Sequence, residues 1–464
     1  MNVRIEKDAL GELEIPAEAY YGIHTARSLE NFKVAGTPFP LEIVCAIVQL
    51  KRACARANEE LGNLDRKKAD AIVTACERIL AGEFNDHFLI DIFQAGSGTS
   101  SNMNINEVIA NIACEQMGFN KGEYKRVHPN DDVNMGQSTN NIVPSGIRLA
   151  GHHYGDNLLA GAEELLLALS AKTEEFADIL KSGRTHLQDA VPVTLGQEFG
   201  AYARAVGKAC ARIKAAQSTL LELGVGGNAV GTGINTKAEF RKLVVEHLNK
   251  TVAEEFYPAE NGIEATQFLT DIAQFSSAVR LFAGDLLKIS NDLRLLSSGP
   301  NTGLAEINLP AVDPGSSIMP GKINPSICEA ANMACMQVMG NDHAIGIATA
   351  AGQLELNTHM PLVGAKLIDS LVVMTRCCRM LAEKCIRGIS ANSEVCEKNF
   401  FASAGLATVL NPALGYDRVS ELVKESLATK TSIRDLILAK GLMEESELDQ
   451  LLANSTGPVK GLAK

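Results

Sequence analysis

Small residues, hydroxyl groups and one ammonium group gather in the stretch from Gly315 to Pro325. Glycines allow backbone N–H groups to approach a ligand closely, and consecutive N–H groups form a nest that binds anions. Lys322 adds a formal positive charge, and the same field favours loss of a proton from a serine such as Ser316 or Ser317. The stretch therefore predicts half of an active site for a dicarboxylate. Residues 315–319 alone are better explained by an ordinary turn.

Short uncharged groups recur in two earlier segments. Thr99 lies in one run of small polar residues, and Ser138, Thr139 and Asn140 lie in another. Their hydroxyl and amide groups can bind carboxylate oxygens without adding charge or bulk. The same residue types cap helices and form Asx turns, and both roles can hold at once.

A further segment carries Thr185 and His186 directly after a helix that we expect to end near Gly183. A lone histidine in a loop is more often a structural hydrogen-bonding group than a functional one. Arg184, directly before Thr185 and His186, would be an electrostatic partner of this segment.

Four blocks of the sequence together resemble the signature of a known family. They are Gly98–Asn104, Gln137–Asn140, Gly183–Asp189 and Gly315–Pro325. In this order they resemble the characteristic blocks of the aspartase/fumarase superfamily, and the similarity continues from Arg4 to about Leu452. The resemblance implies removal of a group from the carbon beta to a carboxylate, which leaves a fumaryl double bond.

The resemblance also implies a role for each polar residue. It makes Ser316 the general base and places His186 and Glu329 as a further catalytic pair. It places these residues around the substrate: Thr99, Ser138, Thr139, Asn140, Thr185, His186, Ser317, Lys322 and Asn324. Lys322 and Asn324 would hold the substrate carboxylate on the carbon that does not lose the proton. Because the C3 proton belongs to a weak carbon acid, catalysis depends on stabilising the doubly charged aci-carboxylate.

The motifs divide between two branches of the family. Gln137–Asn140 and Ala351–Asn357 resemble aspartases. Cys328–Ala330 and the pair Gly226–Gly227 resemble fumarases. Since Thr139 lies nearest the expected chemistry, we expect a lyase that reversibly deaminates L-aspartate to fumarate and ammonium through a C3 carbanion. The alternative is a class II fumarate hydratase, and a catalytically silent crystallin-like relative is a third interpretation.

Two positions depart from the family pattern. Asn141 stands where both branches usually carry an aspartate, and Thr358–Pro361 replaces a more apolar or acidic string. Loss of a carboxylate beside Asn140 either changes the orientation of that amide or indicates a substituted aspartate or an amide as substrate.

The composition excludes several functions. With 464 residues and a net charge of -12, the chain has no basic excess with which to bind nucleic acid. No apolar run has the length of a membrane span or of a signal peptide, so we expect a cytoplasmic protein. The eleven cysteines lie scattered in apolar sequence, which indicates reduced thiols. Without a P-loop or an H-E-x-x-H motif, we expect no metal ligands and no required cofactor, and activation by a divalent cation such as Mg²⁺ stays open.

Long stretches without proline carry apolar residues at helical spacing. They cover residues 157–180, 196–223, 266–296 and 365–386, whereas strand signals are confined to residues 3–5 and 12–15. We therefore predict an all-α, mainly helical fold whose long central helices pack in an oligomer. The resemblance implies a homotetramer with a central multi-helix core and active sites shared by three subunits.

Composition along the chain suggests three domains. We expect a mixed, mostly helical N-terminal domain over residues 1–137, a central long-helix bundle over 138–389, and a small C-terminal helical domain over 390–464. Ser432 and Glu444–Glu445 are typical of helix starts within the last domain. Residues 226–233 have the spacing of a dinucleotide loop, but no strand pattern precedes them, so we expect a close-packing turn.

Overall fold

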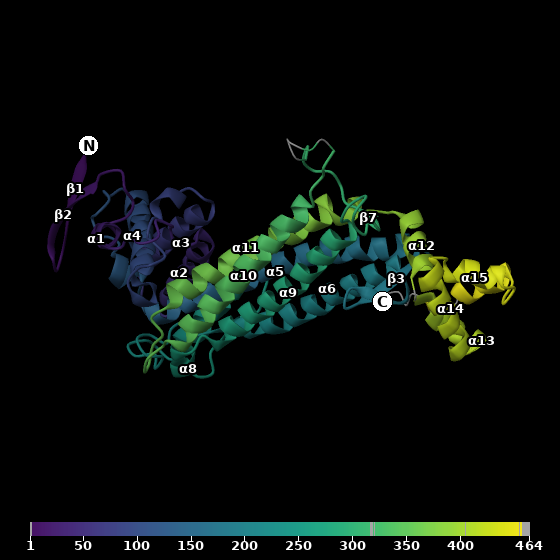
Figure 1. Cartoon of the computed structure of the whole chain (residues 1–464). Helices are drawn as coiled ribbons and strands as arrows, with labels where there is room; N and C mark the ends of the chain where they lie inside the picture. Colours follow the sequence, from purple (N-terminus) through teal and green to yellow (C-terminus); the bar gives the residue numbers. More distant parts are fainter. Residues whose placement is uncertain (1, 316–318, 320, 404, 454, 457–464) are drawn as a thin grey trace. The chain divides into compact units, whose positions relative to one another are not determined.

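The structure is a computed structural model that describes residues 2–315, 319, 321–403, 405–453 and 455–456. Helices dominate it, as Figure 1 shows. The longest are α5 (Thr139–Glu175), α6 (Leu195–Gln217), α9 (Thr270–Leu296), α10 (Ser326–Ala350) and α11 (Met360–Lys384). The expected mainly helical fold is confirmed. In the described part of the chain, no helix combines the length and apolar character needed to cross a membrane.

The chain divides into two compact units, each assembled from separated segments. The first unit consists of Met1–Leu159, Arg212–Leu281 and Gln337–Val373. The second consists of Ala160–Ala211, Phe282–Met336 and Met374–Lys464. Each of the long helices contributes residues to both units. The domain boundaries expected near residues 137 and 389 stay predictions.

The first unit begins with a small hairpin and continues with packed helices. Its elements include β1 (Val3–Asp8), β2 (Gly11–Pro16), α1 (Ile23–Asn31), α2 (Leu41–Glu60), α3 (Arg66–Leu80), α4 (Thr99–Gln116), α7 (Phe240–Asn249) and α8 (Gly262–Gln267). β1 pairs antiparallel with β2, and these two strands include the residues 3–5 and 12–15 that carry the strand signals. Helix α2 packs against α3 and α7 and buries Ile43, Ile47 and Leu50. Asp65 caps α3 by accepting hydrogen bonds from two backbone N–H groups.

A second hairpin replaces an expected helix end. The prediction of a helix that ends near Gly183 is wrong, because α5 ends at Glu175 and residues 180–194 form β3 (Leu180–Thr185) and β4 (Gln188–Thr194). β-Branched residues such as Val191 and Val193 favour strands. The register shifts between Ser182 and Arg184, and a β-carbon at Gly183 would lie 2.8 Å from the carbonyl oxygen of Val191. A glycine therefore permits the bulge.

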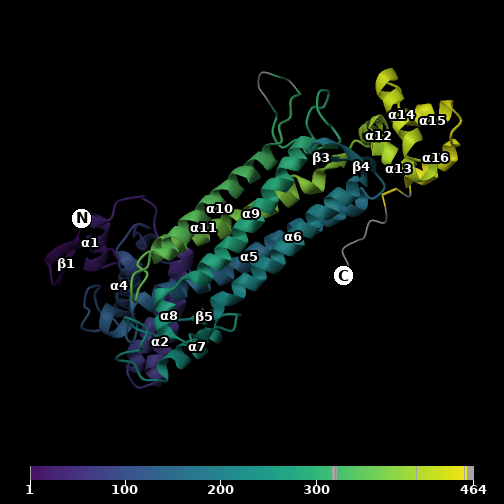
Figure 2. The ribbon, with the colours of Figure 1, turned by 60° about the horizontal axis from the view of Figure 1, so that its bottom comes forward.

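The second unit ends in short helices with their own core. They are α12 (Ser393–Ala402), α13 (Gly405–Leu414), α14 (Tyr416–Thr429), α15 (Ile433–Ala439) and α16 (Glu445–Ala453), which are drawn in yellow-green and yellow in Figure 2. Phe400, Leu410 and Leu448 belong to this core. Ser432 accepts a hydrogen bond from the backbone N–H of Asp435, which confirms the predicted helix start. Short strands of two residues pair in both units. In the first unit, β5 (Glu222–Leu223) pairs parallel with β6 (Tyr257–Pro258). In the second unit, β7 (Ile307–Asn308) pairs antiparallel with β8 (Ser390–Ala391).

The glycine-rich segment at residues 226–233 is a close-packing turn, as predicted. Gly231 has a φ of +99° and lies against the backbone of Gly262, so no side chain fits there. The eleven cysteines are free, which agrees with the prediction of reduced thiols.

Candidate active site

A cleft of about 490 Å³ in the first unit gathers three of the predicted substrate-binding residues. Thr99 is the first residue of α4, Thr139 is the first residue of α5, and Ser138 directly precedes α5. All three line the cleft beside the amides of Asn102, Asn134, Gln137 and Asn228. None of the described residues that line it carries a formal charge. We call it the α4–α5 cleft.

Two helix N-termini meet at the α4–α5 cleft. The free backbone N–H groups of a helix N-terminus act as a partial positive charge. Asn102 Nδ2 donates a hydrogen bond to Thr139 Oγ1 at 3.0 Å, which ties α4 to the start of α5. The cleft thus presents fixed dipoles and hydroxyl groups, an arrangement suited to a carboxylate.

Asn140 does not line the α4–α5 cleft. Its Oδ1 accepts a hydrogen bond from Ser97 Oγ at 3.1 Å, and its Nδ2 donates to the carbonyl oxygen of Ala229 at 2.8 Å. Ser138 Oγ accepts from the backbone N–H of Asn140 at 3.3 Å, so the capping role of Ser138 coexists with its place in the cleft. Both polar ends of the Asn140 amide are used within the unit, and its contact with substrate stays a prediction.

The two positions that depart from the family pattern lie next to the α4–α5 cleft without lining it. Asn141 is buried, and its Nδ2 donates to Thr266 Oγ1 at 2.9 Å. The carbonyl oxygen of Thr358 accepts from the backbone N–H of Ser97 at 2.8 Å, in the turn that leads to Thr99. Both residues therefore position the cleft backbone instead of lining it.

Lys51 is a candidate functional residue that sequence reasoning missed. It is 0% exposed, and its Nζ donates to Asn134 Oδ1 at 3.2 Å and to Gln137 Oε1 at 3.1 Å. Both amides line the α4–α5 cleft. Burial lowers the pKa of Lys51 to about 7. The available signal was a single lysine at helical spacing from Ile47, on the buried and mostly apolar face of α2.

A cleft of about 680 Å³ in the second unit gathers three further predicted residues. Lys322, Asn324 and Glu329 line it beside Arg294, at the N-terminus of α10. Glu329 Oε1 lies 3.6 Å from a guanidinium nitrogen of Arg294. We call it the α10 cleft. Its formal positive charges and the helix N-terminus can hold a carboxylate or stabilise a developing anion.

In the stretch from Gly315 to Pro325, the backbone of Gly315 lies close to the backbone of Lys322, beside this cleft. Gly315 has a φ of +81°, and a β-carbon there would collide with the carbonyl oxygen of Lys322. This position therefore requires glycine. Ser316 and Ser317, the predicted base and its neighbour, lie outside the described residues.

Thr185 and His186 stand at the tip of the β3–β4 hairpin. The two-residue turn has His186 at a φ of 55° and Leu187 at 60°, although neither residue is glycine. Such a turn is normally built from Asn and Gly, so two larger side chains at these φ values carry backbone strain. Thr185, His186 and Leu187 are all exposed, and neither Thr185 nor His186 is among the described residues that line the α10 cleft.

A buried ion-pair network anchors this hairpin. Glu306 is 0% exposed and lies 2.6 Å from a guanidinium nitrogen of Arg184 and 2.9 Å from Lys181 Nζ. Burial alone would raise the pKa of Glu306, but hydrogen bonds and charge from Arg184 and Lys181 outweigh it and hold that pKa below its usual range. Arg184 is therefore a structural partner of Glu306 that fixes the strand leading to His186.

The described candidate residues thus fall into three groups: the α4–α5 cleft, the hairpin tip and the α10 cleft. Each group offers part of what a dicarboxylate needs. The first supplies neutral dipoles, the second an imidazole, and the third formal charge. The pairing of His186 with Glu329 stays a prediction.

Comparison with known proteins identifies the class. The sequence matches the family model described as Lyase over residues 11–340 and the model described as Fumarase C C-terminus over residues 406–455. The chain belongs to this lyase family, which confirms the resemblance to the aspartase/fumarase superfamily.

Individual relatives narrow the class further. The chain is 48% identical to an aspartate ammonia-lyase of Pseudomonas fluorescens, over 97% of this chain and 95% of the relative. A fumarate lyase:delta crystallin from Brucella melitensis bound to cobalt superposes with a TM-score of 0.95 at 43% identity, covering 97% of this chain and 98% of that one. A class II fumarase from Schistosoma mansoni superposes with a TM-score of 0.92 at 38% identity, with the same coverage.

Proposed function

We propose that the protein is an aspartate ammonia-lyase that reversibly converts L-aspartate to fumarate and ammonium. The observation that carries this is 48% identity to a curated aspartate ammonia-lyase along nearly the whole of both chains. The two clefts agree with it, because one offers neutral acceptors and dipoles and the other offers formal positive charge.

The proposed reaction begins at C3 of aspartate. Ser316, as the alkoxide formed when its hydroxyl loses a proton, accepts the C3 proton, and the electron pair of the C–H bond passes into the adjacent carboxylate to give the aci-carboxylate. The N-terminus of α10 stabilises negative charge as it develops, while Lys322 and Asn324 hold the substrate's other carboxylate, on C2. The electrons then form the C2–C3 double bond as the C2–N bond breaks, and the released ammonia takes up a proton to become ammonium.

Hydroxyl groups of the α4–α5 cleft hold the amino end of the substrate in this scheme. Thr99 and Thr139 can each accept a hydrogen bond from a substrate ammonium group and donate to a carboxylate oxygen. His186, paired with Glu329, completes the site from the hairpin tip. The scheme needs no cofactor. A divalent cation such as Mg²⁺ would act only as an activator, and we infer a cytoplasmic location.

Fumarate hydratase is the second candidate, because a class II fumarase also superposes on the chain along its length. Ultraviolet absorbance of fumarate separates the candidates. We expect fumarate from L-aspartate and little from L-malate, whereas activity with L-malate alone would overturn the assignment. No activity with either substrate would favour the catalytically silent, crystallin-like interpretation.

We further propose a homotetramer whose active sites each combine residues of three subunits. Two observations support it. His186 stands on an exposed hairpin tip, where a neighbouring subunit can receive it. Helix α10 exposes Met333 (66%), Met336 (57%) and Ile347 (60%) along one face, and such an apolar face is typical of a subunit interface.

Subunit mixing tests the shared site. Ser316→Ala and the double variant Thr99→Val/Thr139→Val remove groups from different parts of the chain. If a site takes these parts from different subunits, random mixed tetramers regain roughly a quarter of the wild-type activity per site. Native mass spectrometry of the mixture verifies exchange. Exchange without any regain would show that a single chain supplies both groups.

A further inference from the structure

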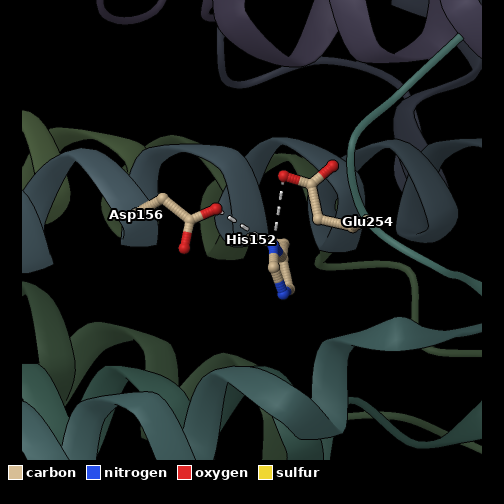
Figure 3. Close-up of side chains that lie close together, drawn as sticks. All are labelled: His152, Asp156 and Glu254. Carbon is tan, nitrogen blue, oxygen red and sulfur yellow. Dashed lines mark ion pairs between the residues drawn. The ribbon is translucent and has the colours of Figure 1, made fainter.

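Outside the two clefts, three potential metal ligands converge in the first unit (Figure 3). His152 and Asp156 lie one turn apart on α5, and Glu254 lies in the segment between α7 and β6. His152 Nδ1 lies 3.5 Å from Asp156 Oδ2 and 3.8 Å from Glu254 Oε1. The three ligand atoms all lie within 4.8 Å of one another.

These distances suit a shared metal ion. Zn²⁺ and similar ions take histidine nitrogen and carboxylate oxygen at about 2.0–2.2 Å, which places ligand atoms of a tetrahedral shell about 3.4 Å apart. The two separations at His152 Nδ1 need only small adjustments to reach that value. Asp156 is 49% exposed, so water can complete the coordination.

His152 Nδ1 supports the same interpretation. The atom is screened from solvent and has no hydrogen-bonding partner in the described part of the chain. It points between the two carboxylates in Figure 3 without making a hydrogen bond to either. A buried polar atom normally has a partner, and an ion between the three groups would provide one.

Neighbouring residues hold the ligands in place. Gln217 is 3% exposed, and its Nε2 donates to Asp156 Oδ1 at 2.8 Å and to the carbonyl oxygen of His152 at 2.7 Å. The other carboxylate oxygen, Asp156 Oδ2, faces His152 Nδ1 and stays available to a metal ion. The ring of Phe256 packs edge-on against the imidazole at 5.8 Å between centroids. Such supporting contacts are typical of metal sites.

We propose that His152, Asp156 and Glu254 bind a divalent transition-metal ion, which ties the segment after α7 to α5. An imidazole with two carboxylates suits Zn²⁺ or Co²⁺, whereas Mg²⁺ prefers an all-oxygen shell. The site is independent of the proposed function, because its ligands line neither the α4–α5 cleft nor the α10 cleft.

Titration of the chelator-treated full-length protein with Co²⁺ tests the site. We expect one Co²⁺ per chain, with intensified visible absorption as the ion leaves octahedral water, and a higher Tm. His152→Gln and Glu254→Gln should abolish both signals. Gln217→Met should weaken Co²⁺ binding by about tenfold or more.

The neighbouring His153 provides the matched control. It is exposed on the same helix, so His153→Gln should bind Co²⁺ as the wild type does. The competing explanation is an ion pair between a protonated His152 and the carboxylates. In that case Co²⁺ causes no absorption change and no Tm shift in the wild-type protein. That result, or equal loss in the His153 variant, would overturn the proposal.

Discussion

The two clefts offer an anion different kinds of attraction. The α4–α5 cleft is lined by neutral hydroxyl and amide groups at two helix N-termini, and its nearby cation, Lys51, is fully buried behind two amides. The α10 cleft is lined by Lys322, Arg294 and Glu329, which carry formal charge at the surface of the cleft itself.

This difference suggests a division of labour. Neutral hydroxyl and amide groups that are already hydrogen-bonded fix the orientation of a carboxylate, and they carry no formal charge for salt to screen. Formal charges act more strongly on an anion that gains charge during the reaction. The α10 cleft should therefore control the rate of carbanion formation, and the α4–α5 cleft should control binding and orientation.

The largest expected effect comes from removing charge from the α10 cleft. Lys322→Met should lower kcat/KM for L-aspartate by roughly 10²–10³-fold, because the substrate carboxylate that Lys322 holds loses its charged partner. Lys398→Met, which removes an exposed lysine of the same unit outside the cleft, should leave kcat/KM unchanged. An equally active Lys322→Met variant would remove the α10 cleft from the mechanism.

The next effect concerns the anchor of the hairpin. Glu306→Gln leaves Lys181 and Arg184 without their shared buried carboxylate and should lower the free energy of unfolding by about 3–5 kcal/mol. Urea unfolding at neutral pH measures it, with the exposed Glu397→Gln as the control.

The same variant has a predicted pH dependence. Because the folded-state pKa of Glu306 is lowered, its contribution is complete above the unfolded pKa and is lost as the pH falls through the lower folded value. The stability difference between wild type and Glu306→Gln should therefore shrink in acid. A difference that stays constant would contradict the assignment of Glu306 as an ionised partner.

Residues with a clear local pattern were predicted from the sequence. Features were missed where a neighbouring pattern hides them or where their partners lie far away in the chain. Ser138, Thr139 and Thr99 were found because hydroxyl groups at helix starts are visible as a local pattern. The β3–β4 hairpin was missed, because the leucine-rich pattern of α5 continues toward Leu180 and hides the change of period. Lys51 was missed because its amide partners lie more than eighty positions later in the chain.

A smaller effect concerns Lys51 and tests whether its charge reaches the α4–α5 cleft. Since burial lowers its pKa to about 7, the folded protein binds fewer protons than the unfolded chain between that value and the ordinary lysine pKa. Stability from this group therefore rises as the pH increases through that range. Substrate affinity should change in the opposite direction, because a dianion prefers the charged lysine.

Lys51→Met separates these two consequences. It should raise KM about tenfold near pH 7 with a smaller change in kcat, and it should abolish the rise of KM with pH above about 7. It should also flatten the pH dependence of urea unfolding. Lys67→Met, at an exposed position, should alter neither. A variant whose KM keeps its pH dependence would show that Lys51 is only structural.

The smallest effect is expected at Thr139, and it completes the comparison of the clefts. Thr139→Val removes one neutral hydroxyl and the acceptor for Asn102, so kcat/KM should fall about fivefold, in line with a net hydrogen bond of about 1 kcal/mol. Thr139→Ser keeps the hydroxyl and should restore most of the activity.

The dependence of activity on salt then distinguishes the two clefts. The loss in Lys322→Met should shrink as ionic strength rises, because screening weakens the charge that the variant lacks, whereas the loss in Thr139→Val should stay constant. Equal salt dependence in both variants would mean that the two clefts do not differ in how they hold the substrate.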